Sequence, residues 1–224
     1  MADSIRMRFC VGEPGRFISH LDVLRMVERS VRRAGLPIEY SEGFNPIPKM
    51  AFASALPVGI TSEAEYVDLK MKTAVESGEA TAALNSVLPQ GFQILEAVNL
   101  PERSEALMSI ITTAQYQIKL LQAVPGLETR ITEILDQKEI SILVKRKNKT
   151  REKNIRELID RLTYDDAANS IFLQCACGLK QNLRPMDLLP FLGLSIGDVL
   201  IHRTALLVKT AEGALLTPFE AVKG

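Results

Sequence analysis

Residues 4–35, SIRMRFCVGEPGRFISHLDVLRMVERSVRRAG, contain the signals for a strand, a turn and a helix in immediate succession. Apolar and basic side chains alternate in residues 4–11, which predicts a strand with one apolar and one polar face. The next four residues, Gly-Glu-Pro-Gly, interrupt that pattern. Ser19 is typical of a helix N-cap, with Asp22 placed to form a capping box, and Gly35 marks the end of the helix. The segment therefore predicts a β-α unit.

The helix expected up to residue 34 has two different faces. Its apolar side chains recur at the helical spacing and predict a buried stripe made of Val23, Leu24, Val27, Val31 and Ala34. Four arginines lie on the other side of the helix: Arg25, Arg29, Arg32 and Arg33. Arginine is well suited to binding phosphate, because its planar guanidinium can donate hydrogen bonds to two phosphate oxygens at once. The alternative is an ordinary solvated helix surface that Glu28 partly neutralises. Further basic side chains in adjacent elements are Arg6, Arg8 and Arg16.

The order of predicted elements repeats along the chain. In the first half we expect short extended segments at 37–40 and 50–56, strands at 66–71 and 92–100, and a helix at 76–87. In the second half we expect strands at 115–121, 140–144, 171–177 and 200–208, and helices at 127–136 and 185–192. Each half thus runs approximately β-α-β-β-α-β, the ferredoxin-like order.

These patterns predict an α+β protein built from two tandem ferredoxin-like units with antiparallel sheets. We expect an N-terminal domain over residues 1–100, a linker over 101–114, and a C-terminal domain over 115–224.

Composition is that of a globular protein, with 46% hydrophobic and 24% charged residues among 224. The sequence contains no apolar run of about 18 residues, so we expect no membrane association. The N-terminal residues lack the pattern of a signal peptide, and three cysteines are too few for a disulfide scaffold. Both features favour a cytoplasmic location.

The cysteines are the first candidates for metal chemistry. Cys175 and Cys177 are two residues apart in a predicted strand, so they share one face and could form half of a metal site. The alternative is two small buried apolar side chains. A structural zinc site needs four ligands, and only His20 and His202 are available elsewhere. Three cysteines also cannot fill the four positions of a cysteine-only iron–sulfur cluster. We therefore expect no metal and no cofactor.

His20 is the one candidate for catalysis. It lies in the first turn of the predicted helix, where it could act as a general base or contact an anion. Its position on the apolar side favours a buried, hydrogen-bonded histidine instead. The sequence contains neither the G-x-S-x-G elbow of a serine hydrolase nor a glycine-rich phosphate loop. We therefore assign no catalytic residue.

Net charge is zero, with 27 basic and 27 acidic residues, yet charge is unevenly distributed. Residues 51–110 hold eight acidic against three basic side chains. Residues 145–156 hold seven basic side chains against one acidic, where we expect a hairpin or loop between the second and third strands of the second half. Such a segment can bind a nucleic-acid backbone, remain a solvated loop, or contact an acidic protein. Its candidate phosphate-binding residues are Lys145, Arg146, Lys147, Lys149, Arg151 and Lys153.

The segment 41–48, Ser-Glu-Gly-Phe-Asn-Pro-Ile-Pro, is predicted to form a stiff loop. Its prolines fix the turn, and its glycine permits a positive φ. We expect the loop to lie near the start of the first helix and to form a binding site there. The residues of that expected site are Ser19, His20, Ser41, Gly43, Phe44, Asn45 and Pro46. Aromatic side chains suited to stacking on bases are otherwise scarce, with Tyr40 and Tyr164 the others considered, and the sequence has no aromatic pair of the RRM type.

Five motifs together resemble a known bacterial family: FISHLD (17–22), RRAGLP (32–37), YSEGFNPIP (40–48), ALPVGI (55–60) and SEAEYVD (62–68). This is the radical-SAM-linked family of unknown function, found fused to B12-binding radical SAM proteins or as a separate chain beside them. The resemblance is dense over residues 5–72 and looser to about residue 210. It implies a radical SAM protein as partner and brings no catalytic residues.

A more distant likeness is to the tandem ferredoxin-like proteins that process CRISPR RNA. The present sequence lacks their C-terminal glycine-rich loop, so the likeness implies RNA binding without implying RNA cleavage. Our leading hypothesis is a non-enzymatic accessory module that acts with a B12-binding radical SAM protein and binds RNA or a ribosomal or tRNA substrate. The alternatives are a small RNA-processing enzyme that uses His20, and a protein–protein adaptor that docks through the acidic region 51–110.

Overall fold

A computed structural model describes residues 4–146 and 149–223. The chain forms two compact units: unit 1 consists of Met1–Ile111 and Ala205–Gly224, and unit 2 of Thr112–Thr204. The strand pairs described within each unit are antiparallel. The predicted α+β class with mostly antiparallel strand pairing is therefore confirmed.

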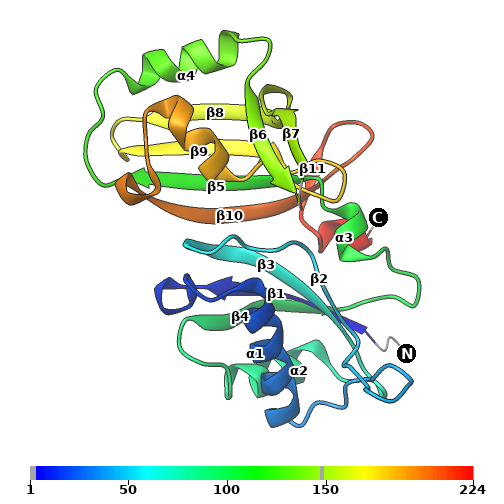
Figure 1. The fold of residues 1–224 in the computed structure, drawn as a ribbon. Helices are drawn as coiled ribbons and strands as arrows, with labels where there is room; N and C mark the ends of the chain where they lie inside the picture. The colour runs from blue at the N-terminus through cyan, green and yellow to red at the C-terminus, as the bar shows by residue number, and fades with distance from the viewer. Residues whose placement is uncertain (1–3, 147–148, 224) are drawn as a thin grey trace. The chain divides into compact units, whose positions relative to one another are not determined.

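Unit 1 has its strands in the order β4-β1-β3-β2. Along the chain, its first six regular elements follow the expected order β-α-β-β-α-β, apart from a short 3-10 turn after β1. The elements are β1 (Ser4–Val11), η1 (Glu13–Gly15), α1 (His20–Arg33), β2 (Met50–Phe52), β3 (Ile60–Lys70), α2 (Ser77–Asn85), β4 (Phe92–Asn99), α3 (Leu107–Ile110), β11 (Leu215–Leu216) and α6 (Glu220–Lys223). Figure 1 shows α1 and α2 together on one side of the unit 1 sheet.

The core of unit 1 lies between that helix pair and the sheet. The alternating apolar side chains of β1 are buried there, together with the predicted stripe of α1 at Val23, Val27 and Val31. Both ends of α1 follow the local signals. Ser19 accepts a hydrogen bond from the Asp22 amide at 3.3 Å. Gly35, at φ 68°, ends the helix with the paired backbone bonds of a Schellman motif.

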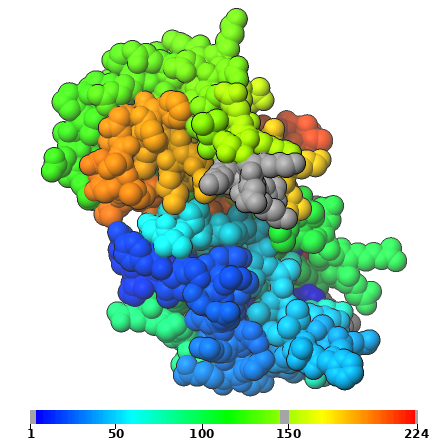
Figure 2. All heavy atoms as spheres, viewed as in Figure 1, coloured from blue at the N-terminus to red at the C-terminus, as the bar shows by residue number. Residues whose placement is uncertain are grey.

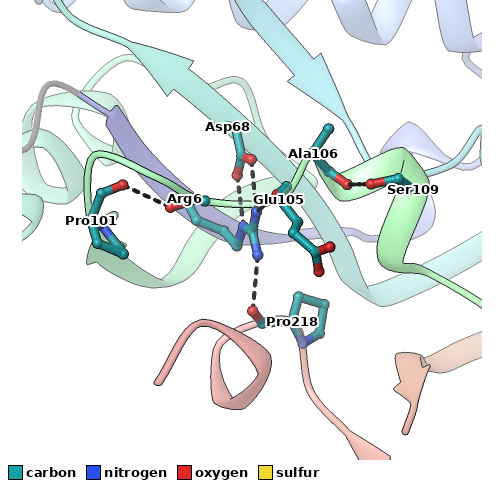
Figure 3. Close-up of polar contacts among 8 residues, drawn as sticks. Arg6, Asp68, Pro101, Glu105, Ala106, Ser109 and Pro218 are labelled. Carbon is teal, nitrogen blue, oxygen red and sulfur yellow. Dashed lines mark hydrogen bonds and ion pairs between the residues drawn. The ribbon is translucent and has the colours of Figure 1, made fainter. Parts of the chain in front are cut away.

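The second face of β1 differs from the prediction, because Arg6 is fully buried. Its guanidinium donates to both carboxylate oxygens of Asp68, at 2.8 and 2.9 Å. It also donates to the carbonyls of Glu105 and Pro218, at 3.1 and 3.0 Å (Figure 3). Arg6 is therefore not available to a phosphate. The alternation in residues 4–11 predicts a solvated face, because local sequence does not show that distant segments of unit 1 cover it.

Unit 2 contains strands in the order β5-β9-β8 and a separate hairpin of β6 and β7. Its elements are β5 (Thr113–Leu120), α4 (Leu127–Asp136), β6 (Ser141–Arg146), β7 (Lys149–Asn154), η2 (Arg156–Leu158), β8 (Ile159–Asp165), β9 (Ser170–Ala176), α5 (Pro185–Leu188), η3 (Leu189–Leu192) and η4 (Ile196–Asp198). The last long strand, β10 (Val199–Lys209), begins in unit 2 and ends in unit 1, where it pairs with β11.

The arrangement of unit 2 corrects two expectations. The strand predicted at 140–144 does not pair with β9, because it forms the hairpin β6–β7 and β8 takes the place beside β9. The helix predicted over 185–192 is four α-helical residues followed by a 3-10 turn. Pro190 explains that change, because it has no N–H to donate to the preceding turn of an α-helix. Two equivalent ferredoxin-like units are consequently not confirmed.

Candidate functional site

The first turn of α1 holds His20 against the core. Its imidazole meets the ring of Phe52 edge to face, with centroids 5.8 Å apart. Burial lowers the pKa of His20 below its usual 6.5, and the negative charge of Glu65 offsets part of that shift. Glu65 itself is buried and accepts a hydrogen bond from the Ser62 hydroxyl at 2.7 Å. His20 is thus held as a neutral, packed side chain at pH 7.

The space beside His20 is small. A cavity of about 10 Å³ is lined by His20, Phe9, Phe52, Glu65 and Arg16, together with neighbouring apolar residues. That volume is about the space that one water molecule needs. A catalytic histidine has to come within hydrogen-bond distance of its substrate. The geometry therefore favours the structural interpretation of His20 over the catalytic one.

The four arginines of α1 are exposed, and two of them are engaged in ion pairs. Arg25 pairs with Asp22 at 3.2 Å, and Arg32 pairs with Glu28 at 2.6 Å. Arg29 and Arg33 form no ion pair or hydrogen bond with any residue that the structure describes. These two keep their full hydrogen-bonding capacity for a ligand.

Tyr40 joins the end of α1 to the loop that follows. Arg32 donates from Nε to the Tyr40 hydroxyl at 3.2 Å, and its guanidinium lies 5.9 Å from the ring centroid. The ammonium of Lys72 lies 5.8 Å from the same centroid. Cations at this distance from an aromatic ring are attracted by its π electrons. Tyr40 therefore gathers two positive charges beside the exposed arginines.

The loop 41–48 begins immediately after Tyr40 and is closed by its own backbone. The Ser41 amide donates to the Ile47 carbonyl at 2.8 Å, and the Ser41 hydroxyl accepts from the Ile47 amide at 3.0 Å. Gly43 has φ 121°, which supports the predicted role of this glycine. Phe44, at the tip, is fully exposed. Figure 2 shows the loop as a light-blue protrusion next to the end of α1.

The expected proximity of this loop to Ser19 and His20 is not observed. The loop adjoins the last turn of α1 through Tyr40 and Arg32, whereas Ser19 and His20 lie at the first turn. From His20 to Arg32 the helix rises about 18 Å. The predicted site thus separates into two places, with Ser41, Gly43, Phe44, Asn45 and Pro46 at one end of α1 and Ser19 and His20 at the other.

We call the group of side chains at the C-terminal end of α1 and in the loop after it the helix-end surface. It consists of the half-buried Tyr40 and the exposed side chains of Arg29, Arg32, Arg33, Lys72 and Phe44. Nearby, Glu39 forms ion pairs with Lys49 and Lys70, so these two cations are partly neutralised.

The basic segment of unit 2 forms the hairpin β6–β7. Lys147 lies outside the described residues, as do the side chains of Lys145, Arg146 and Lys149. Arg151 is exposed, whereas Lys153 donates to the Asn182 carbonyl. Arg156 donates to the Leu135 carbonyl at the end of α4. Part of the predicted positive segment therefore has a structural role.

Of the remaining predicted cations, Arg8 and Arg16 are engaged within unit 1. Arg8 pairs with Glu96 at 3.4 Å, and Arg16 pairs with Glu13 at 2.9 Å. The guanidinium of Arg16 also lies 4.5 Å from the centroid of the Phe17 ring.

Cys175 and Cys177 are buried, and burial raises the pKa of the Cys175 thiol. Its Sγ lies 3.7 Å from the Leu183 carbonyl, so the thiol is a weak donor inside the unit 2 core. Within residues 4–146 and 149–223, no three histidine, cysteine or carboxylate side chains gather as a metal site would require. In the same part of the chain, no helix has the length and apolar character to cross a membrane.

Comparisons with known proteins give a family and a distant structural likeness. A family model described as "Uncharacterized protein conserved in bacteria (DUF2344)" matches residues 4–185. No curated protein matches in sequence. A chain in a solved structure entitled "Crystal Structure of a Cbf5-Nop10-Gar1 Complex" is similar at 13% identity and a TM-score of 0.44. The similarity covers 92% of the present chain and 49% of that chain, so the present protein spans about half of its length.

Proposed function

The chain belongs to the uncharacterized bacterial family DUF2344, and we propose that it is a non-enzymatic module that binds single-stranded RNA. The observation that carries the proposal is the helix-end surface, where Arg32 and Lys72 flank the ring of Tyr40 and the loop that follows Tyr40 presents a fully exposed phenylalanine, Phe44.

The cations of this surface supply the contacts to phosphate. Arg29 and Arg33 are exposed without described ion pairs, so binding a phosphate does not require them to break one. Arg32 is fixed in place by Tyr40 and Glu28, which reduces the side-chain entropy lost on binding. Lys72 adds a point charge 5.8 Å from the centroid of the Tyr40 ring.

Phe44 supplies the contact to a base. A loop closed by Ser41 and Ile47 holds this ring away from the body of unit 1. Aromatic side chains bind the faces of unstacked bases, which single strands offer and duplexes do not. The combination of a stacking ring with several arginines therefore favours single-stranded RNA as the ligand.

The two alternatives receive different support. A small RNA-processing enzyme that uses His20 is disfavoured, because the cavity beside that residue is only about 10 Å³ in volume.

A contact with a protein is favoured by a separate group of exposed apolar side chains near the start of α1, namely Phe17, Leu21 and Val58. The Gly59 amide donates to the Arg16 carbonyl at 2.6 Å, which holds residue 58 close to this group.

We assign that apolar group to the protein partner, and the partner itself to the radical SAM class. The second assignment rests on the resemblance of residues 5–72 alone. In this proposal the partner supplies the radical chemistry, while the present chain holds the RNA. The acidic region 51–110 is less suited to docking, because Glu65 is buried and Asp68 is paired with Arg6.

The proposal is tested by measuring how tightly the purified full chain binds a labelled single-stranded RNA as the salt concentration rises. We expect the logarithm of the affinity to fall linearly with the logarithm of the salt concentration, with a slope of about 0.7 per phosphate neutralised. A duplex of the same sequence should bind more weakly. Absence of binding even at low salt would refute the proposal and leave the protein–protein adaptor in its place.

A further inference from the structure

One face of the unit 2 sheet carries a group of six exposed or half-buried side chains, most of them polar. This face carries Gln115 and Gln117 of β5, Phe172 and Gln174 of β9, and Arg161 and Thr163 of β8. Phe172 is 40% exposed and is the aromatic member of the group. Leu173 and Cys175, which alternate with these positions along β9, point to the opposite side and are buried in the core.

The strand register gathers the six side chains into two rows. Phe172 lies between Gln117 and Thr163, and the neighbouring row places Gln174 between Gln115 and Arg161. Directly opposed side chains in antiparallel strands have Cβ atoms about 5 Å apart. The phenyl ring is thus bordered by amides, a hydroxyl and a guanidinium within reach of one small planar molecule.

A β-bulge aims Arg161 at this face. Ile159 pairs with Cys175 while Arg161 pairs with Gln174, so β8 has one extra residue, Asp160, at this point. Without the bulge, Ile159 and Arg161 would lie on the same side of the sheet. With it, Ile159 enters the core and Arg161 lines the opposite face. Bulges often serve to redirect a side chain in this way next to a functional site.

The groups around Phe172 keep hydrogen-bonding capacity for a ligand. Gln115 donates from Nε2 to Oε1 of Gln174 at 2.9 Å, which leaves the Gln115 oxygen and the Gln174 amino group unused by any described residue. Arg161 forms no hydrogen bond or ion pair within the described part of the chain. A hollow of about 300 Å³ is lined by these residues together with Tyr116, Thr163, Leu173 and Thr204.

We propose that this hollow, formed by Phe172, Gln115, Gln174 and Arg161, is a second stacking site that takes one base of a single-stranded RNA. The base lies on the Phe172 ring, its polar edge meets the amides, and Arg161 binds the adjacent phosphate. An apolar protein side chain is a poorer occupant, because it would bury the amides and the guanidinium without partners. This inference rests on the proposed RNA binding and extends it to a site in unit 2.

The test exploits the absence of tryptophan from the chain. Three variants, each made alone in the full chain, introduce one fluorescent tryptophan. Phe172→Trp places it at the unit 2 hollow, Phe44→Trp at the helix-end surface, and Phe17→Trp at an exposed control position. Each variant is titrated with a single-stranded oligoadenylate and with an abasic strand of the same length. We expect Phe172→Trp to be quenched by the oligoadenylate and not by the abasic strand.

The reporters separate the two proposals. Quenching of Phe44→Trp without quenching of Phe172→Trp overturns the unit 2 site and leaves the helix-end surface intact. Quenching of Phe172→Trp alone supports the unit 2 site and refutes the helix-end surface. Equal quenching of Phe172→Trp by the abasic strand refutes base stacking, and quenching of Phe17→Trp to the same extent shows nonspecific association and overturns both.

Loss-of-function variants give an independent measure. Phe172→Ala should weaken binding to the oligoadenylate by about 5- to 150-fold, the range for one stacked base. The salt dependence should be unchanged, because no charge is removed. Arg161→Gln should instead lower the slope of the salt dependence by about 0.7. Unchanged affinity in a folded Phe172→Ala variant would contradict the inference.

Discussion

The guanidinium of Arg6 binds both carboxylate oxygens of Asp68 at 2.8 and 2.9 Å and is completely buried. Burial raises the pKa of Asp68, and the arginine offsets part of that rise. The same guanidinium donates hydrogen bonds to the Pro218 and Glu105 carbonyls. One side chain of β1 therefore binds two segments of unit 1 that are distant in sequence. Figure 3 shows these partners around it.

We expect Arg6→Met to destabilise unit 1 strongly. Loss of one member of a buried ion pair leaves the other charge uncompensated, which costs about 3–5 kcal/mol. The measurement is the free energy of unfolding from urea titration. Arg8→Met is the matched control, because Arg8 lies in the same strand with its ion pair exposed to solvent, and it should cost less than about 1 kcal/mol. Equal effects of the two substitutions would contradict a structural role for Arg6.

The half-buried position of His20 predicts a pH-dependent stability. Because its folded pKa lies below 6.5, the unfolded chain binds the proton more strongly than the folded one between these two values. The contribution of His20 to stability is therefore complete above pH 6.5 and decreases as the pH falls towards the folded pKa. Urea titrations at pH 7.5, 6.5 and 5.5 should show this decrease, and His20→Gln should reduce it. An identical pH dependence in the variant argues against a lowered pKa of His20 in the folded protein.

The exposed arginines of α1 should control the salt dependence of RNA binding. Replacing Arg29 and Arg33 by Gln keeps good helix-forming residues and removes two charges. We expect the slope of log affinity against log salt to fall by about 0.7 for each phosphate that the variant no longer neutralises. Arg103→Gln, at an exposed position between β4 and α3, is the control and should leave the slope unchanged. A slope that does not respond to Arg29 and Arg33 would place the phosphate-binding residues elsewhere.

Phe44 should affect affinity without affecting the salt dependence. Phe44→Ala removes a stacking surface worth about 1–3 kcal/mol per base and removes no charge. Binding of several RNA sequences, measured by fluorescence anisotropy, should weaken, and differences among the sequences should shrink. Phe17→Ala, which removes another exposed ring, should leave both unchanged. If the two alanine variants weaken binding equally, Phe44 does not contact the RNA specifically.

The parts of the fold that depend on local sequence agree with the prediction. Helix α1 begins one residue after its predicted cap, and Gly35 ends it, because capping depends on a few neighbouring residues. Val23, Val27 and Val31 of its predicted apolar stripe are buried, and Leu24 and Ala34 are partly buried, because helical spacing alone places these side chains on one side of the helix. The covered face of β1 is not predictable in this way, since the Pro218 carbonyl that accepts from Arg6 lies 212 residues away.

Two differences between prediction and structure have a geometric origin. The sequence pattern does not reveal strand β8. Its bulge leaves two exposed polar residues, Asp160 and Arg161, in succession, and this interrupts the alternation of buried and exposed residues that marks a strand. The loop 41–48 lies at the other end of α1 from the one predicted, because spacing along the sequence does not tell which end of a helix a later loop approaches.

Phe172 is absent from the predicted binding residues. The alternation that places Leu173 and Cys175 on one face of the strand nevertheless implies that Phe172 lies on the other face.

The most direct test of RNA binding at the helix-end surface is to crosslink the full chain to a single-stranded RNA with ultraviolet light and identify the modified peptides by mass spectrometry. Binding at the helix-end surface predicts crosslinks within residues 40–48, which include Tyr40 and Phe44, and their loss when Arg29 and Arg33 are replaced by Gln. Crosslinks confined to peptides outside unit 1, or none at all at low salt, would contradict it.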